Sequence, residues 1–207
     1  MTSINQPRNT LMRRADIENV RKKALTDAAI QAVGAQGSMD VTMADIAARA
    51  GVSPALAHHY FGSKQDLMTA SVRALLAELR ADAIAAMGDA HTPRARLSAI
   101  IHVSFSAKQF STETVAAWLA FYVEAQRNPG LSRLLGVYGR RLHSNLMSGL
   151  RPMVGELQAN RIAEGAAAMI DGLYIRKALG SAGTRADPVQ LVEDHIETQI
   201  ASVRRFA

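Results

Sequence analysis

The chain of 207 residues contains no cysteine, few aromatic side chains and no long apolar run. Without cysteine it can form no disulfide, no thiolate nucleophile and no cysteine-ligated zinc site. Aromatic residues make up only 5% of the chain, and no segment alternates apolar and polar residues over the length of a strand. No apolar run reaches the roughly 18 residues of a membrane span, and the polar stretch 1–10 lacks the apolar core of a signal peptide. We therefore expect an all-α, cytoplasmic protein with no membrane partner.

Acidic residues are outnumbered by basic ones, 18 to 24, which gives a formal net charge of +6. This balance favours partners that carry phosphate or another anion, although ordinary solubility charge would give the same number. No glycine-rich phosphate loop, Ser/His/Asp set or pair of carboxylates has the spacing of a catalytic site. We therefore expect a protein that is not an enzyme, with no catalytic residues, no cofactor and no metal.

Apolar residues recur at helical spacing along most of the chain, and glycine, proline and capping residues divide it into about nine helices. The first 12 residues are expected to form a disordered arm. The predicted helices cover residues 14–36, 42–50, 53–61, 63–87, 94–110, 112–127, 130–153, 157–180 and 188–205. We expect a small N-terminal domain over 13–62, and a larger helical domain over 63–207.

Residues 42–61 have the pattern of a helix-turn-helix. Two short helices meet at Gly51, which can adopt the positive φ that a tight turn between them requires. Apolar side chains stand where the two crossed helices must pack. These are Ile46, Ala47, Val52, Leu56 and Phe61.

The second short helix carries small or hydrogen-bonding side chains and no acidic residue, which suits an element that enters the major groove of DNA. The residues expected to face outward are Ser53, Pro54, Ala55, Ala57, His58, His59 and Tyr60. Thr42 and Lys64, at the starts of the flanking helices, are placed to meet phosphates. A helical hairpin without a partner is the alternative. Metal binding by His58 and His59 is disfavoured because neighbours on a helix point about 100° apart.

Residues 42–67 resemble the DNA-binding signature of the TetR family of repressors through the runs Gly-Val-Ser, His-Tyr-Phe and Ser-Lys, and through Leu67. The likeness covers about residues 14–87. It implies that Thr42, Tyr60 and Lys64 contact phosphates and that positions 53–59 face bases of double-stranded operator DNA. Ala55 replaces a common glycine and His58 a frequent tyrosine, so the resemblance does not indicate the operator sequence.

Three C-terminal blocks, 117–122, 140–146 and 168–174, resemble the choline-responsive branch of the same family, which controls glycine betaine synthesis. The resemblance implies a small-molecule effector, choline or a related quaternary amine. Tyr122 stands where that branch has a second tryptophan. This departure leaves open a different amine or a hydrophobic effector.

The residues of these blocks suggest a cation site. Trp118, Phe121 and Tyr122 share one helix face, while Asp171 and Tyr174 lie three apart on another helix. Aromatic faces attract a quaternary ammonium group, and a carboxylate supplies the counter-charge. The alternative is that the rings are core and that Asp171 pairs with a nearby arginine. The candidate arginines are Arg140, Arg141 and Arg176.

The last two predicted helices are the expected homodimer face, since a single short reading helix binds weakly and two can span half-sites roughly 34–36 Å apart. Small residues there are Gly165, Ala166, Ala167, Ala168 and Gly172, and an apolar stripe comprises Leu191, Ile196, Ile200 and Val203. Packing within one chain is the alternative for both sets.

Release of DNA is expected when ligand favours a conformation in which helix 63–87 has swung, which moves the two DNA-binding heads apart. Basic residues near the start of the first helix would add salt-dependent affinity. These are Arg13, Arg14, Arg21, Lys22 and Lys23. A ligand-independent DNA-binding protein and a membrane-surface protein are the remaining alternatives.

Overall fold

The computed structural model describes residues 14–180 and 186–205, and the arm expected over residues 1–12 lies outside them. The described part is all-helical, which confirms the predicted fold class. The helices are α1 (Arg14–Gln36), α2 (Met43–Arg49), α3 (Pro54–Phe61), α4 (Lys64–Gly88), α5 (Pro93–Ser104), α6 (Thr112–Ala125), α7 (Pro129–Ala178) and α8 (Pro188–Arg205).

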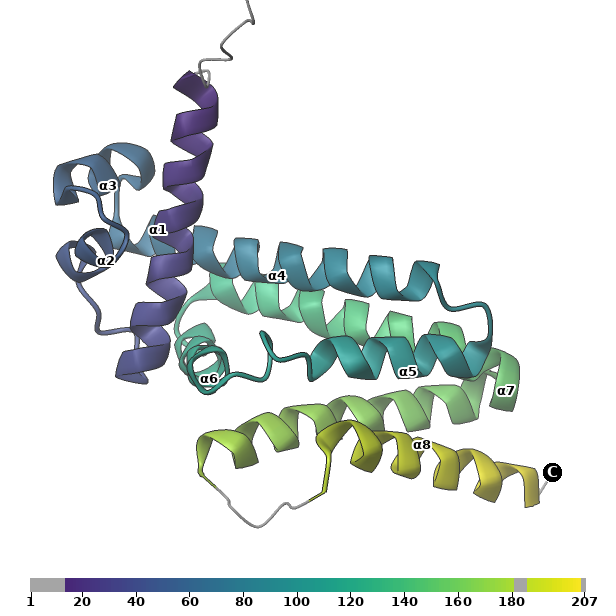
Figure 1. Ribbon diagram of the computed structural model, residues 1–207. Helices are drawn as coiled ribbons and strands as arrows, with labels where there is room; N and C mark the ends of the chain where they lie inside the picture. Colours follow the sequence, from purple (N-terminus) through teal and green to yellow (C-terminus); the bar gives the residue numbers. More distant parts are fainter. Residues whose placement is uncertain (1–13, 181–185, 206–207) are drawn as a thin grey trace, which may run out of the picture.

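Helix α7 is bent back on itself at Gly155, whose φ of 76° and ψ of 172° are not helical. Pro152 precedes the bend and cannot donate the backbone hydrogen bond that would continue the helix. The two arms of α7, residues 129–154 and 156–178, run in opposite directions (Figure 1). Each arm corresponds to one of the nine predicted helices. The predicted count exceeds the observed count by one only because both arms are counted here as a single helix, α7.

The predicted helix 94–110 is too long. Helix α5 ends at Ser104, and Phe105 has a φ of −107° and a ψ of 17°, outside the helical region. The residues that follow, up to Ser111 at the cap of α6, form a connection rather than a final helical turn. No glycine or proline marks this end, so the sequence offered no stop signal.

Helices α1, α2 and α3 form a compact head at one end of the molecule, and α4 leads from it along the C-terminal half (Figure 1). Serine and threonine fix the starts of these helices. The side chains of Thr42, Ser53 and Ser63 each accept a hydrogen bond from the backbone N–H three residues on. Their positions agree with the predicted helix starts to within a residue.

The head and the C-terminal half share one continuous apolar core, and α1 packs along α6 as well as α4. At the α1–α6 contact the backbones approach so closely that a Cβ on Gly34 would lie within 2.8 Å of the carbonyl carbon of Glu113. Only glycine fits there. Among the described residues, no helix combines the length and apolar composition needed to cross a bilayer.

Candidate DNA-binding surface and effector site

Helix α3 lies against α2 and leaves its N-terminal turn and outer face free. Ser53, the N-cap residue, accepts a hydrogen bond from Leu56 N at 3.2 Å, which starts the helix at Pro54. The side chains of Ser53, Pro54 and Ala55 are exposed. Because no acidic residue lies in this helix, the free surface does not repel a phosphate backbone.

The expected outward position of Ala57 is wrong. Ala57 is fully buried and belongs to the same core cluster as Ile46 and Ala47 of α2. The inward face of α3 therefore runs through Ala57, whereas Leu56 is only half-buried. Periodicity alone could not distinguish these neighbouring apolar residues, because either gives a helix one apolar face.

His58 and His59 are both exposed, as predicted, but their surroundings differ. The Nδ1 atom of His58 lies 3.0 Å from the carbonyl oxygen of Gly62, so this ring is fixed to the end of its own helix. The ring of His59 packs at 5.6 Å from that of Tyr60. Lys22 of α1 lies 5.8 Å from the centre of the Tyr60 ring, on the same surface.

Thr42 and Lys64 flank this surface, and both already make contacts within the chain. The hydroxyl of Thr42 donates to Asp45 at 2.6 Å and accepts from the backbone N–H of Asp45 at 3.1 Å. The Thr42 hydroxyl bond is the main cause of a lowered pKa of Asp45. Lys64 donates to the carbonyl oxygen of Met39 at 3.2 Å. A phosphate would have to compete with Asp45 for the Thr42 hydroxyl.

The basic residues expected to add salt-dependent affinity are partly neutralised. Lys22 pairs with Glu18 at 2.6 Å, and Lys23 pairs with Asp27 at 2.7 Å and with Glu78 of α4 at 3.4 Å. Arg21 is exposed. Arg13 and the side chain of Arg14 lie outside the described residues.

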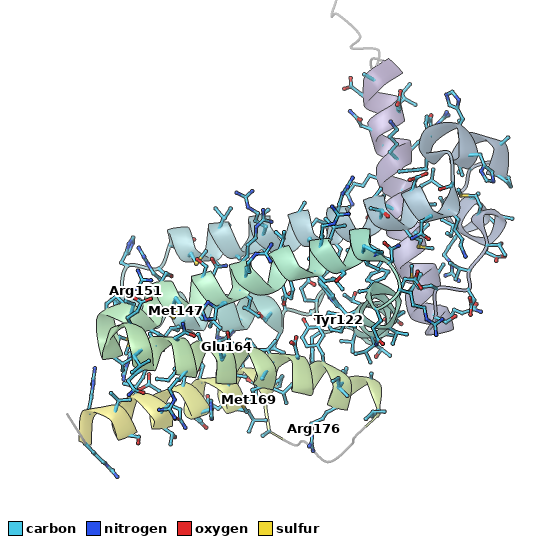
Figure 2. The ribbon with its side chains drawn as sticks, turned by 180° about the vertical axis from the view of Figure 1, so that it is seen from behind. Tyr122, Met147, Arg151, Glu164, Met169 and Arg176 are labelled. Carbon is cyan, nitrogen blue, oxygen red and sulfur yellow. The ribbon has the colours of Figure 1, made fainter. Side chains whose placement is uncertain are left out.

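In the C-terminal half, an aromatic cluster joins α6 to the first arm of α7. The ring of Trp118 lies 5.9 Å from that of Tyr122 and 5.2 Å from that of Tyr138. Tyr122 donates a long hydrogen bond of 3.4 Å from its hydroxyl to Asp171 on the second arm of α7. Figure 2 shows Tyr122 at the end of the C-terminal half that adjoins the head, opposite the end that carries Arg151.

The cluster consists of Trp118, Tyr122, Tyr138 and Asp171. It excludes enough water to shift the pKa values of its ionisable side chains. Burial raises the pKa of Asp171, and the Tyr122 hydrogen bond only partly opposes this, although the residue itself reaches the surface. Burial and then the charge of Asp171 raise the pKa of both Tyr122 and Tyr138. The phenols therefore stay neutral, and Asp171 is the carboxyl group of the cluster.

Two of the predicted effector residues are not in this cluster. Phe121 is fully buried in the core, and the ring contacts of the described residues do not join it to Trp118 or Tyr122. Tyr174 packs on Phe105 and Phe110, and its hydroxyl donates to the carbonyl oxygen of Ser104. Helical spacing placed these side chains on the right helices but could not identify the neighbours of each ring.

Tyr138 is the member of the cluster that sequence reasoning missed. It lies on the first arm of α7 and packs on Trp118 of α6, a contact between two helices. Spacing within one helix gives no signal for such a contact between helices.

A cavity close to this cluster lies between α4, α5 and the first arm of α7, and has a volume of about 250 Å³. Tyr138 lines it, and so does Ser104, which accepts the Tyr174 hydrogen bond. None of the five predicted effector residues does. The observed aromatic cluster and the cavity therefore share Tyr138, and their other lining residues differ.

Two buried side chains of the described C-terminal half have polar atoms without a hydrogen-bond partner. The indole N–H of Trp118 is buried and makes no hydrogen bond within the described part of the chain. Gln109, in the connection between α5 and α6, is fully buried with its side-chain amide unpaired. Such groups cost free energy unless a ligand or ordered water satisfies them.

The predicted dimer stripe on α8 is half wrong. Ile196 and Ile200 are buried in the chain's own core, as is Ala166 on the second arm of α7. Gly165, Ala168 and Gly172 remain at least partly exposed. Packing within the chain therefore accounts for some residues of both predicted sets. Gly165, Ala168 and Gly172 remain as a stripe of small residues on the surface.

An exposed reading helix held by a three-helix head, on an all-helical body with a cavity between α4, α5 and α7, is the architecture of a helix-turn-helix transcriptional regulator. The family model "Bacterial regulatory proteins, tetR family" matches residues 25–70, and "BetI-type transcriptional repressor, C-terminal" matches residues 93–201. The chain belongs to the TetR family and carries the BetI-type C-terminal domain. It is a DNA-binding transcriptional repressor and not an enzyme.

Known relatives and structures agree with this assignment. The chain is 58% identical over 190 residues to the HTH-type transcriptional regulator BetI of Rhizobium meliloti, covering 91% of this chain and 94% of that protein. It is 57% identical over 193 residues to BetI of Agrobacterium fabrum, covering 92% and 93%.

Among solved structures, a transcriptional regulator from Pseudomonas aeruginosa superposes with a TM-score of 0.78 at 25% identity, covering 97% of this chain and 100% of that one. A regulator from Saccharomonospora viridis in complex with choline superposes with a TM-score of 0.70 at 22% identity, covering 87% and 95%. The latter likeness concerns the fold alone.

Proposed function

We propose that this repressor binds a palindromic operator as a homodimer and releases it when choline or a related quaternary amine binds. It would act in the cytoplasm, where a bacterial operator lies, and would control choline uptake and glycine betaine synthesis. The observation that carries the proposal is the exposed, acid-free outer face of α3 at the tip of the head.

The base-reading surface would consist of exposed residues on and before α3. These are Ser53, Pro54, Ala55, His58 and His59. Tyr60, Lys64 and Thr42 would contact phosphates around it. The boundary between the DNA-binding domain, 13–62, and the effector domain, 63–207, falls at the start of α4.

The effector would contact the cluster of Trp118, Tyr122, Tyr138 and Asp171, with Tyr174 beside it. Each aromatic face contributes on the order of 0.5–2 kcal/mol to a desolvated cation. Asp171 supplies the counter-charge, and its contact with Tyr122 at 3.4 Å is long enough to be given up readily. The relatives named BetI and the choline complex of the Saccharomonospora viridis regulator support this chemistry. Another amine effector is the second candidate, because Tyr122 departs from the tryptophan expected there.

The dimer would form through the second arm of α7 and α8. Small or apolar residues at spacings of three and four follow one side of this arm and stay at least partly exposed. They are Gly165, Ala168, Gly172, Ile175 and Leu179. Ile175 is 46% exposed and Leu179 74%, which is unusual for side chains of this size. Such a stripe lets a second helix approach closely, as in a four-helix interface.

Ligand would shift the population of two arrangements of the head. A difference of roughly 1–3 kcal/mol in ligand affinity between them changes operator affinity about 5- to 150-fold. Helix α4 would carry the movement, and the packing of α1 on α6 offers a second connection, since α6 bears Trp118 and Tyr122.

A gel-shift titration with the DNA upstream of the protein's own gene tests the proposal. Choline chloride is compared with sodium chloride at equal concentration, because protein–DNA affinity depends on salt. We expect specific binding that choline weakens at least fivefold more than sodium chloride does. Equal weakening by both salts would contradict the effector assignment, and no preference for this DNA over random duplex would contradict the operator assignment.

A further inference from the structure

The cavity between α4, α5 and the first arm of α7 has a chemistry opposite to that of the aromatic cluster. Its walls are apolar and mostly buried, and they come from all three helices. They include Leu76, Leu79, Ala83, Ile100, Val103 and Leu142. A volume of about 250 Å³ lies near the lower end of the range for small-molecule sites. The walls therefore suit a short apolar chain.

The rim of this cavity is cationic. Arg80 of α4 and Arg141 of α7 line it from two helices, with the half-buried amide of Asn145 beside them, and no acidic residue lines it. Among the ion pairs of the described residues, neither Arg80 nor Arg141 has a carboxylate partner. The guanidinium groups, each with a fixed fork of donors, are therefore available to a carboxylate or phosphate.

A quaternary ammonium ion fits this cavity poorly, because two guanidinium groups would repel it and no carboxylate would neutralise it. The negative charge of Asp171 lies in the aromatic cluster, which shares only Tyr138 with the cavity. The alternative in which Arg141 pairs with Asp171 is not observed, since Asp171 contacts Tyr122 and Arg141 lines the cavity. The two regions thus separate a cation site from an anion site.

We propose that this cavity binds a second ligand, an amphiphile with a carboxylate or phosphate head on a short apolar chain. The chain would lie among the leucines of α4 and α7 and the isoleucine of α5. The head would be held between Arg80 and Arg141. Since α4 leads to the DNA-binding head, a ligand that joins α4 to α7 would also oppose movement of α4 against the body (Figure 1).

Calorimetric titration of the full-length protein tests this site. The anionic probes are octanoate and octyl phosphate, which distinguish a carboxylate head group from a phosphate. Two controls carry the same alkyl chain: octyltrimethylammonium has a cationic head group and octanol a neutral one. We expect saturable binding of one or both anions at one site per chain, and at least tenfold weaker binding of the cation. Equal binding of octanoate and octyltrimethylammonium, or no saturable binding of either anion, would overturn the proposal.

Variants locate the site. Arg141→Gln and Arg80→Gln should each weaken anion binding at least tenfold, whereas Arg140→Gln, an exposed neighbour that does not line the cavity, should leave it unchanged. Filling the cavity with Ala83→Phe should abolish anion binding while circular dichroism confirms folding. An equal loss in Arg140→Gln and Arg141→Gln would refute the assignment.

Choline titration of the same variants separates this proposal from the effector assignment above. Choline should bind Arg80→Gln and Arg141→Gln as it binds the unaltered protein. If the anions bind and choline does not, only the effector assignment fails. If either arginine substitution abolishes choline binding as well, the two sites are not separate and the present proposal fails.

Discussion

At the scale of single residues, the DNA-binding surface depends on which side chains of α3 are free. His58 is fixed to Gly62 at 3.0 Å, whereas the hydrogen bonds of the described residues include none from the His59 imidazole. Among the ring contacts of the described residues, His59 has one, with Tyr60. The imidazole that can reach a base edge without breaking an existing contact is therefore that of His59.

We predict that His59→Ala weakens binding to the operator by about 1–3 kcal/mol, the usual value of one good base contact. The melting temperature should not change, because the side chain is exposed. Fluorescence anisotropy with labelled operator measures the affinity, and His102→Ala, an exposed histidine on α5, is the matched control. Equal affinity for operator in both variants would remove His59 from the reading surface.

Asp171 should give the proposed effector site a pH dependence. Its pKa is raised above the ordinary value of 3.8 by burial, and a bound cation favours the ionised form. Choline affinity should therefore be full at neutral pH and fall as the pH is lowered through the raised pKa. Asp171→Asn should lower choline affinity at pH 7 about tenfold, or ~1.4 kcal/mol, and flatten the profile. Calorimetry at several pH values checks this, with Asp82→Asn as control; an unchanged pH profile in Asp171→Asn would contradict it.

At the scale of helices and their contacts, the sequence predicted most starts and stops but not most neighbours. Thr42, Ser53, Ser63 and Ser111 all cap helices in the structure, because capping depends on local backbone geometry that the sequence carries. The early end of α5 at Ser104 was missed, since no local signal marks it.

Tertiary neighbours account for the errors at the two candidate sites. Ala57 and Leu56 are equally suited to an inward position by pattern, and the packing of α3 on α2 selects Ala57. The aromatic cluster contains Tyr138 in place of the predicted Phe121 for a similar reason. Helical spacing relates residues on one helix, whereas the aromatic cluster is made between α6 and α7.

The α1–α6 contact yields a prediction at this scale. Gly34→Ala would place a Cβ within 2.8 Å of the Glu113 carbonyl carbon, so the two helices must move apart. We expect a loss of about 1–3 kcal/mol in the free energy of unfolding, as for other overpacked contacts. We also expect a weaker effect of choline on operator affinity.

Gly139→Ala is the matched control for this contact, because nothing lies within 4 Å of its added Cβ. Alanine in place of a helical glycine should leave stability unchanged or raise it by about 0.5–1 kcal/mol. Urea denaturation measures both variants. Equal stability of Gly34→Ala and Gly139→Ala would show that the contact is not tight.

At the scale of the whole molecule, specific binding to a palindromic operator would require two chains. One α3 helix of eight residues offers few base contacts, and only a dimer presents two at the separation of successive major grooves. The exposed stripe on the second arm of α7 would supply the surface. Its small residues would allow backbones to approach, and its large residues Ile175 and Leu179 would be covered.

We predict that Ala168→Arg on this stripe converts the dimer to a monomer and abolishes specific operator binding, while helix content is retained. A long charged side chain would be forced into the close approach of two helices. Light scattering after size exclusion gives the mass. Ala77→Arg, at an exposed alanine of α4, should remain dimeric and bind DNA normally. Dimers in both variants would move the interface elsewhere.

The most direct test of the account is hydroxyl-radical footprinting of the DNA upstream of the protein's own gene. Two α3 helices facing successive major grooves predict two protected half-sites on one face of the duplex, with centres roughly 34–36 Å or a multiple of it apart. Choline should remove both protections together. Uniform protection without half-sites, or a footprint on random duplex of equal strength, would contradict the central claim that paired α3 helices read an operator.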